Sequence, residues 1–287
     1  MPVVVVTDSS SRLPAAVAEH YGIVVVPLHL SVDGEEYAEG VDEIPEDLIT
    51  RPGVTTSGAN PKELTAAFGE AVAASEGAGV VAVMMSRRLS GTWSAARLAA
   101  EQYPGVIRVV DSRSVGLALG FAALAAAQAA QAGADRDRVY ESAIRQASIT
   151  ESLICVQQLD NLRNSGRISA ASRLLGSALS IKPILGLDDG MLVLRDRQRT
   201  FSRAVDKMIT NAVEFADGRP VTLGIQHCQA PETAAEIAER VHPKLRVVTS
   251  QLTVDLGPIL GSHIGPNAVG LVLTPQLEPI VGADVTD

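Results

Sequence analysis

The chain has 287 residues, of which 46% are hydrophobic, and a net charge of −9 from 33 acidic and 24 basic side chains. This length is typical of about two domains, and this hydrophobic content excludes disorder as the main state. The acidic excess argues against binding to a phosphate backbone, and an aromatic content of 3% argues against base stacking, so we expect no nucleic-acid partner.

Short β-branched runs alternate with alanine-rich stretches through the first half of the chain. This pattern predicts strands at residues 3–6, 23–28, 80–84 and 106–110, and helices at residues 14–20, 61–74, 91–101 and 115–131. Strands that alternate with helices of this length are typical of βαβ units. We therefore expect an α/β domain with a mostly parallel sheet over residues 1–152.

The pattern changes after about residue 150. Strands are predicted at residues 153–156, 191–194, 221–226, 246–249 and 269–273, with two helical stretches between the first pair. Gly166 is expected to end the first of these helices and Ser169 to cap the second. The second half therefore predicts a separate α+β domain with a mixed sheet over residues 153–287.

Three features bear on the protein's environment. Residues 114–134 carry no charge but are mostly alanine without aromatic or basic anchors, which favours a buried helix over a membrane span. The amino terminus lacks the pattern of a secretory signal peptide. Cys155 and Cys228 have no partner at zinc-binding spacing. We expect a reduced, cytoplasmic protein with no integral membrane segment, no metal and no cofactor.

Hydroxyl-rich turns follow three of the predicted first-half strands, at residues 7–10, 86–92 and 111–114. Ligands bind at the carboxyl ends of parallel strands, so these turns mark the expected site. Ser90 precedes a helix predicted to begin at Gly91, where free backbone N–H groups and the helix dipole attract an anion. The phosphate-binding motifs GxxxxGK[ST] and GxGxxG are absent, which leaves a small carboxylate or simple helix capping by Ser90.

A second hydroxyl pair lies at Thr56 and Ser57. Asn60, followed by Pro61 and Glu63, predicts a capped helix start just after this pair. The helix start does not account for Thr56 and Ser57, so their hydroxyls are candidates for binding a ligand.

Residues 163–203 carry eight basic and three acidic side chains, which is typical either of a solvated face or of a docking site for an anion. His263 lies between Gly261 and Gly265, a spacing that predicts a loop and a near-neutral pKa. Ser90, His263 and Asp111 could in principle assemble as a catalytic triad. A small-ester or acyl-phosphate hydrolase that uses Ser90 and His263 is therefore an alternative function.

Seven segments in register resemble the DegV family of bacterial fatty-acid-binding proteins across essentially the whole chain. They are Thr7-Asp8-Ser9, Thr56-Ser57, Leu89-Ser90-Gly91-Thr92, Asp111-Ser112, Gly166-Arg167-Ile168-Ser169, Ile181-Lys182-Pro183-Ile184-Leu185 and His263-Ile264-Gly265-Pro266. The resemblance implies two α/β domains with a long-chain fatty acid in the cleft between them. It also implies a partner, the ATP-binding subunit of a fatty acid kinase, which phosphorylates the bound acid for phospholipid synthesis.

The resemblance also implies roles for individual residues. Thr56 and Ser90, with Ser57 and Gly91 beside them, would bind the carboxylate. The rim of the head group, or the contact with the kinase and its phosphate, would be formed by Arg167, Arg199 and His263. The chain departs from the family pattern at residues 58–60, where Gly-Ala-Asn replaces the common Gln-Pro-Ser. The resemblance therefore predicts a non-catalytic protein that binds a fatty acid and presents its carboxylate.

Overall fold

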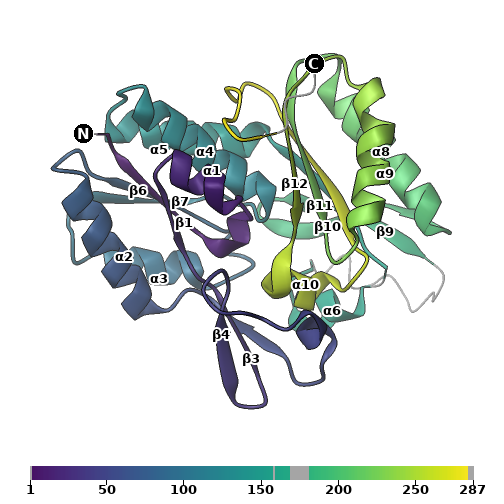
Figure 1. The fold of residues 1–287 in the computed structure, drawn as a ribbon, viewed down its shortest axis with the longest axis horizontal. Helices are drawn as coiled ribbons and strands as arrows, with labels where there is room; N and C mark the ends of the chain where they lie inside the picture. Colours follow the sequence, from purple (N-terminus) through teal and green to yellow (C-terminus); the bar gives the residue numbers. More distant parts are fainter. Residues whose placement is uncertain (1, 158, 169–180, 284–287) are drawn as a thin grey trace.

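The computed structural model describes residues 2–157, 159–168 and 181–283 (Figure 1). Its first sheet is parallel and has the strand order β2-β1-β6-β7. The strands are β1 (Val4–Asp8), β2 (Ile23–Val26), β6 (Val80–Met84) and β7 (Ile107–Asp111). All four lie within two residues of their predicted positions, and the expected parallel α/β arrangement is confirmed.

Two pairs of helices cover this sheet on opposite sides (Figure 1). One pair is α2 (Pro61–Ala74) with α3 (Thr92–Ala100), and the other is α4 (Leu117–Gln131) with α5 (Arg136–Ile149). The short helix α1 (Ala15–His20) packs against β2. As expected, Asn60 caps α2, because its side chain accepts a hydrogen bond from the amide of Lys62.

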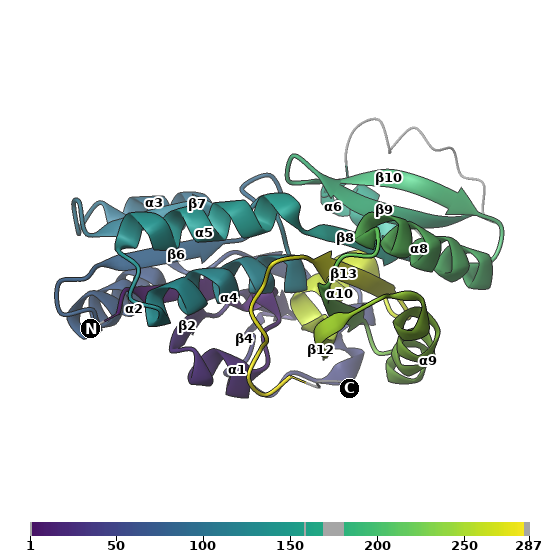
Figure 2. The same ribbon diagram turned by 90° about the horizontal axis from the view of Figure 1, so that it is seen from above.

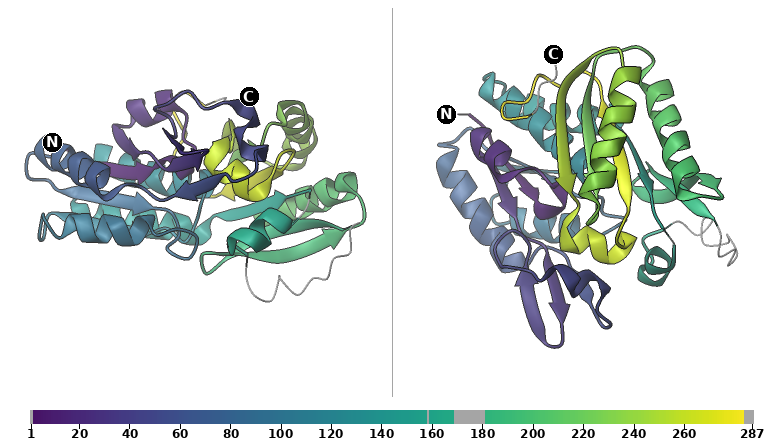
Figure 3. Two further views of the ribbon diagram at one scale, coloured as in Figure 1. Left: turned by 90° about the horizontal axis from the view of Figure 1, so that it is seen from below. Right: turned by 45° about the vertical axis from the view of Figure 1, so that its right-hand side comes forward.

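A small antiparallel sheet projects from this region and was not predicted from the sequence. It has the order β4-β3-β5, with β3 (His29–Val32), β4 (Glu35–Ala38) and β5 (Thr55–Ser57). The 3-10 helix η2 (Glu46–Thr50) lies between β4 and β5. Figure 3 shows this sheet beside α10 (Gly257–Ile264), which contacts η2, β3 and β5.

The second half forms a six-stranded sheet with the order β10-β9-β8-β13-β11-β12. Only β11 and β12 are parallel, so the predicted mixed sheet is confirmed. The strands are β8 (Glu151–Cys155), β9 (Lys182–Asp188), β10 (Met191–Gln198), β11 (Val221–His227), β12 (Val248–Asp255) and β13 (Val269–Thr274). The strand β9 was not predicted.

Helices cover one face of this sheet, and the first half of the chain covers the other. Both α8 (Phe201–Ala216) and α9 (Pro231–Val241) pack on the outer face (Figure 2). The side chains of β13 alternate between the faces: Leu271 and Leu273 belong to the core under α8 and α9, whereas Val272 belongs to the core of the first half. The six-stranded sheet is therefore packed directly against the first half.

The division of the chain at residues 152 and 153 stays a prediction. The strand β8 begins at Glu151, close to that point. After β13, however, Leu277 and Ile280 return to the core of the first half, and the side chain of Gln128 on α4 donates to the carbonyl of Glu278. Of the two helices predicted after β8, the first is α6 (Asp160–Ser165); the second, with its cap Ser169, lies outside the described residues.

Within the described residues, none of the helices has the length and apolar character needed to cross a membrane. The uncharged segment predicted as a buried helix is α4, most of whose side chains are buried. The Ala-rich composition lets α4 lie close to α5, to the sheet and to the 3-10 helix η1 (Ser9–Ser11) that follows β1. At η1, Gly120 of α4 approaches the carbonyl of Ser11. This prediction is confirmed.

Candidate functional site

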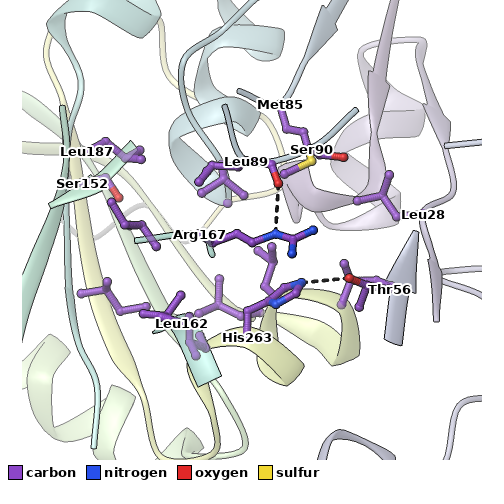
Figure 4. Close-up of a pocket in the computed structure, with 18 of the residues that line it drawn as sticks. Leu28, Thr56, Met85, Leu89, Ser90, Ser152, Leu162, Arg167, Leu187 and His263 are labelled. Carbon is purple, nitrogen blue, oxygen red and sulfur yellow. Dashed lines mark hydrogen bonds between the residues drawn. The ribbon is translucent and has the colours of Figure 1, made fainter. Parts of the chain in front are cut away.

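A mostly apolar cavity, called here the inner cavity, lies between the first half of the chain and the six-stranded sheet (Figure 4). Its walls come from both halves, since β2–β3, the β6–α3 turn, β8, β9, β10, α6 and α10 all contribute. The lining residues are Leu28, Thr56, Ser57, Gly58, Met85, Leu89, Ser90, Val115, Gly116, Ser152, Ile154, Leu162, Arg167, Leu187, Leu192, Gln226, Leu256, Ile259, Leu260, His263 and Ile264. An aliphatic lining of this kind fits a flexible hydrocarbon chain better than a flat aromatic ring.

Polar side chains gather at one end of the inner cavity. Thr56 on β5 and His263 on α10 form a hydrogen bond of 2.9 Å between Oγ1 and Nε2 (Figure 4). Thr56, Arg167 and His263 also line a polar groove on the outside of the protein, called here the outer groove. The three residues therefore mark where the apolar interior meets the surface.

Ser90 lies at the same end, in the turn before α3. Its Oγ accepts a hydrogen bond of 3.2 Å from the amide of Thr92 and shares one of 2.9 Å with the Thr92 hydroxyl. The Thr92 hydroxyl also accepts from the amide of Ala59, and either hydroxyl of the Ser90–Thr92 pair can be the donor. When Thr92 is the donor in this pair, the hydroxyl proton of Ser90 can be donated to a ligand.

Gly58 explains how the β5–α2 loop reaches Ser90. A Cβ at this position would lie 2.7 Å from the Thr92 hydroxyl and 3.1 Å from that of Ser90. Glycine therefore allows the loop that carries Thr56 to approach the start of α3 closely. The departure from the family pattern at residue 58 thus occurs in the wall of the site.

Ser57 and Gly91 contribute less to the lining of the inner cavity than expected. Ser57 lines the inner cavity but is exposed, and Gly91 is exposed and does not line it. The helix predicted to begin at Gly91 begins one residue later, at Thr92, and the amide of Thr92 is occupied by Ser90. Capping by Ser90 is therefore present, while the structure gives Gly91 no place in the inner cavity.

Arg167 follows α6 and extends across the cavity toward Ser90 (Figure 4). Its Nε donates to the carbonyl of Leu89 at 3.3 Å, and its Nη1 donates to the carbonyl of Ser165. Because these acceptors are neutral carbonyls, the positive charge of Arg167 stays available to an anion at the polar end.

His263 differs from expectation in two ways. The sequence predicted a loop, but His263 lies in the last turn of α10, because Gly257 and Pro258 begin a helix that continues to Ile264. Burial, and secondly the charge of Arg167, lower the pKa of His263 from 6.5 to about 4, rather than leaving it near neutral. The imidazole is therefore neutral at neutral pH.

Arg199 and α4 are not part of the inner cavity. Arg199 is exposed in the turn between β10 and α8 and does not line the inner cavity, so the structure does not bring it to Arg167 and His263 there. Of the segment around α4, only Val115 and Gly116, which precede the helix, line the cavity, and α4 itself lies beside α5 on the first sheet and contacts β13 of the second.

The hydrolase alternative finds no support in these contacts. His263 is bonded to Thr56, whereas Ser90 is bonded to Thr92. Asp111 forms an ion pair with Arg87 and lines a different groove. The three members of the considered triad are therefore held by three different partners.

Some lining residues were missed by the sequence analysis. Ser152 on β8 and Gln226 on β11 are polar residues on the face of the sheet that looks into the inner cavity. The amide oxygen of Gln226 accepts from the backbone of Leu117 at 2.7 Å, which ties β11 to the start of α4. A glutamine within a mostly apolar strand was the sequence signal of this contact.

The cysteines contribute no reactive group to the site. Both are buried and unpaired, and burial raises the pKa of the Cys155 and Cys228 thiols to about 12. Among the residues that the structure describes, no group of three or more His, Cys, Asp or Glu side chains is placed to hold a metal ion.

Comparison with known proteins places this geometry in context. The model of the DegV family, described as one of uncharacterised proteins, matches residues 2–276. The DegV domain-containing protein Rv2417c of Mycobacterium tuberculosis is 45% identical over 279 residues, which cover 97% of this chain and 99% of that protein. A similar protein of Streptomyces coelicolor, SCO2569, is 37% identical over 276 residues, covering 95% of this chain and 98% of that protein.

Solved structures share the fold over nearly the whole chain. DegV family protein Cg2579 from Corynebacterium glutamicum superposes with a TM-score of 0.85 at 34% identity, covering 97% of this chain and 99% of that one. A DegV family protein from Thermus thermophilus, described by its fatty acid binding, gives 0.89 at 28% identity, with coverage of 96% and 100%. DegV from Bacillus subtilis, described as a fatty acid binding protein, gives 0.86 at 28% identity with the same coverage.

Proposed function

The chain belongs to the DegV family, and from this premise we propose that it binds a long-chain fatty acid in the inner cavity, with the carboxylate at Thr56 and Ser90. The observation that carries the proposal is an aliphatic cavity with all its charged and imidazole groups at one end. The fatty acid binding described for the Thermus thermophilus and Bacillus subtilis proteins supports it.

The polar end suits a carboxylate. Ser90 has a hydroxyl proton to donate, Thr56 adds a second hydroxyl, and Arg167 supplies a positive charge beside them. Hydrogen bonds from these groups to an ionised oxygen are stronger than those between neutral partners. The acyl chain would then extend among the leucines and isoleucines of the cavity, so that burial sets the affinity and the hydroxyls set the orientation.

The lipid proposal is tested by identifying what copurifies. Native mass spectrometry of protein purified without added lipid is expected to show one long-chain acid per chain. Ser90→Ala and Thr56→Val are each expected to weaken binding of added palmitic acid by about tenfold to a hundredfold, the value of one lost hydrogen bond to a charged group. Ser94→Ala, an exposed serine on α3, is the matched control. Empty wild-type protein that also takes up no added acid would contradict the proposal.

We further propose that the bound acid is presented to the ATP-binding subunit of a fatty acid kinase. A carboxylate oxygen of the acid would attack the γ-phosphorus of ATP, forming an acyl phosphate while ADP leaves. Arg167 and His263 line both the inner cavity and the outer groove, so a carboxylate beside them would be within reach from outside. The protein itself then acts as a non-catalytic, lipid-presenting subunit.

A reconstituted reaction tests this second part. With such a kinase subunit, ATP and lipid-loaded protein, hydroxylamine is expected to trap the acyl phosphate as a hydroxamate. Charge reversal at Arg199, which is exposed and away from the cavity, is expected to reduce hydroxamate formation without changing the bound lipid. Arg138→Glu, an exposed position on α5, is the control. Equal turnover by wild type and Arg199→Glu would count against a role for Arg199 in the kinase contact.

A further inference from the structure

The inner cavity reaches a second groove at the end away from Thr56. This side groove lies between β7, α5 and the β9–β10 hairpin, and it is lined by charged side chains, among them Arg87, Asp111, Arg113, Glu151, Asp189 and Arg195. Ser152 and Leu187 line both the inner cavity and the side groove. In Figure 4, these two residues lie on the opposite side of the cavity from Thr56.

Ser152 and Leu187, called here the partition, separate the inner cavity from the side groove, and Leu187 has the larger side chain of the two. It is half-buried and packs against both the core of the first half and the smaller core around β9, β10 and α6. The β8–β9 register pairs Leu153 with Gly186, which places Ser152 beside Leu187. The β9–β10 register pairs Leu187 with Leu192, which lines the inner cavity but not the side groove.

The partition is held in place by the tip of the hairpin. The buried Ser86 donates from Oγ to the carbonyl of Gly190 at 2.7 Å. Asp189 pairs with Arg88 and Arg113, at 3.1 Å in each case. Gly190 has φ +78°, and any Cβ there would collide with the Ser86 hydroxyl. The hairpin that carries Leu187 is therefore fixed across both halves of the chain.

We propose that Leu187 is a specificity-determining residue that sets the longest acyl chain the inner cavity holds. The inference rests on the proposed fatty acid function. A chain anchored at Thr56 and Ser90 gains from each methylene only while it stays among apolar side chains. Beyond Leu187 it would enter a groove lined by arginines and carboxylates, where a methylene displaces water from charged groups and adds little affinity.

The experiment measures binding of a series of saturated acids, from dodecanoic to docosanoic acid, by competition in native mass spectrometry. Leu187→Ala removes three carbon atoms from the partition, so the preferred chain is expected to lengthen by about two carbons and the longest acids to bind about tenfold tighter. Leu187→Phe is expected to shorten the preferred chain by about two carbons. Val193→Ala, the matched control on the same hairpin, removes two carbon atoms from a half-buried residue that lines neither the inner cavity nor the side groove, and it is expected to keep the wild-type preference.

Unchanged length profiles in both Leu187 variants, with wild-type protein still binding acids through Ser90, would overturn the inference and leave the lipid function standing. An equal shift in Val193→Ala would also overturn it, because a general change in the hairpin rather than the side chain of Leu187 would then set the length. If Leu187→Ala does not fold, as judged by circular dichroism, Leu187→Val is expected to lengthen the preference by about one carbon. Wild-type protein that binds none of the acids would instead refute the proposed function.

Discussion

His263 is expected to titrate near pH 4 in the lipid-free protein, and this has a measurable effect on stability. Burial, followed by the charge of Arg167, lowers its pKa from 6.5 to about 4. As the pH falls between these values, the unfolded chain binds a proton that the folded protein does not, so the free energy of unfolding decreases. At 1.36 kcal/mol for each unit of pKa, the loss reaches about 3 kcal/mol near pH 4.

Urea unfolding of wild type and His263→Gln over about pH 7 to pH 4 tests this magnitude. Glutamine stays neutral throughout and can still form a hydrogen bond with Thr56. Asp8 and Glu39, whose pKa values are raised by burial, titrate in both proteins and therefore cancel in the difference. Wild type is expected to lose about 3 kcal/mol more than the variant, and the ring-proton NMR signal of His263 should have its midpoint near 4.

Parallel stability curves, or a His263 midpoint near 6.5, would refute the reasoning about burial. The same NMR signal also reports on the ligand. A carboxylate bound next to Thr56 would favour the charged imidazolium, so loading with palmitic acid is expected to move the midpoint upward. A midpoint that does not move would place the carboxylate elsewhere.

Three further predictions concern the rest of the molecule. Gly257→Ala is expected to lower the free energy of unfolding by about 1–3 kcal/mol, measured in urea, because Gly257 has φ +71° and a Cβ would lie 2.5 Å from the Glu39 carboxylate. Cys155 and Cys228 are expected to resist iodoacetamide at neutral pH until the protein is unfolded, as measured by mass spectrometry, because their pKa is about 12. Phe121→Ala is expected to cost about 3–5 kcal/mol in urea unfolding but to leave lipid occupancy unchanged, because Phe121 is buried on α4 away from the cavity.

The elements that the sequence predicted well are those with a strong local pattern. The β-branched run at β6 and the capped helix α2 were predicted to the residue, because a buried parallel strand and a Pro at the start of a helix each have a distinct pattern. The strands β3, β4 and β5 are three or four residues long and contain polar residues among few apolar ones, so no hydrophobic run identifies them. The helix α10 was missed because Gly257 and Pro258 were not recognised as a helix start.

The site was predictable only in part, for a similar reason. The hydroxyls of Thr56 and Ser90 stood out because helix capping did not account for Thr56 and because a free helix start follows Ser90. The hydrogen bond between Thr56 and His263 depends on how α10 packs against β5, which no local pattern encodes. The partition of Ser152 and Leu187 depends on the β8–β9 register, and β9 itself was not predicted.

The polar end and the apolar walls of the inner cavity are expected to contribute differently to the binding of a fatty acid. At the polar end, hydroxyls and a single charge orient the carboxylate, and each hydrogen bond to it contributes about 1.5–3 kcal/mol. Along the walls, each buried methylene contributes about 0.8 kcal/mol, so about fifteen of them contribute about 12 kcal/mol before the cost of immobilising the chain. Affinity therefore rises with chain length only as far as Leu187. If that residue is the limit, the protein selects its acid by where the chain ends, while the chemistry at Ser90 stays the same for every acid.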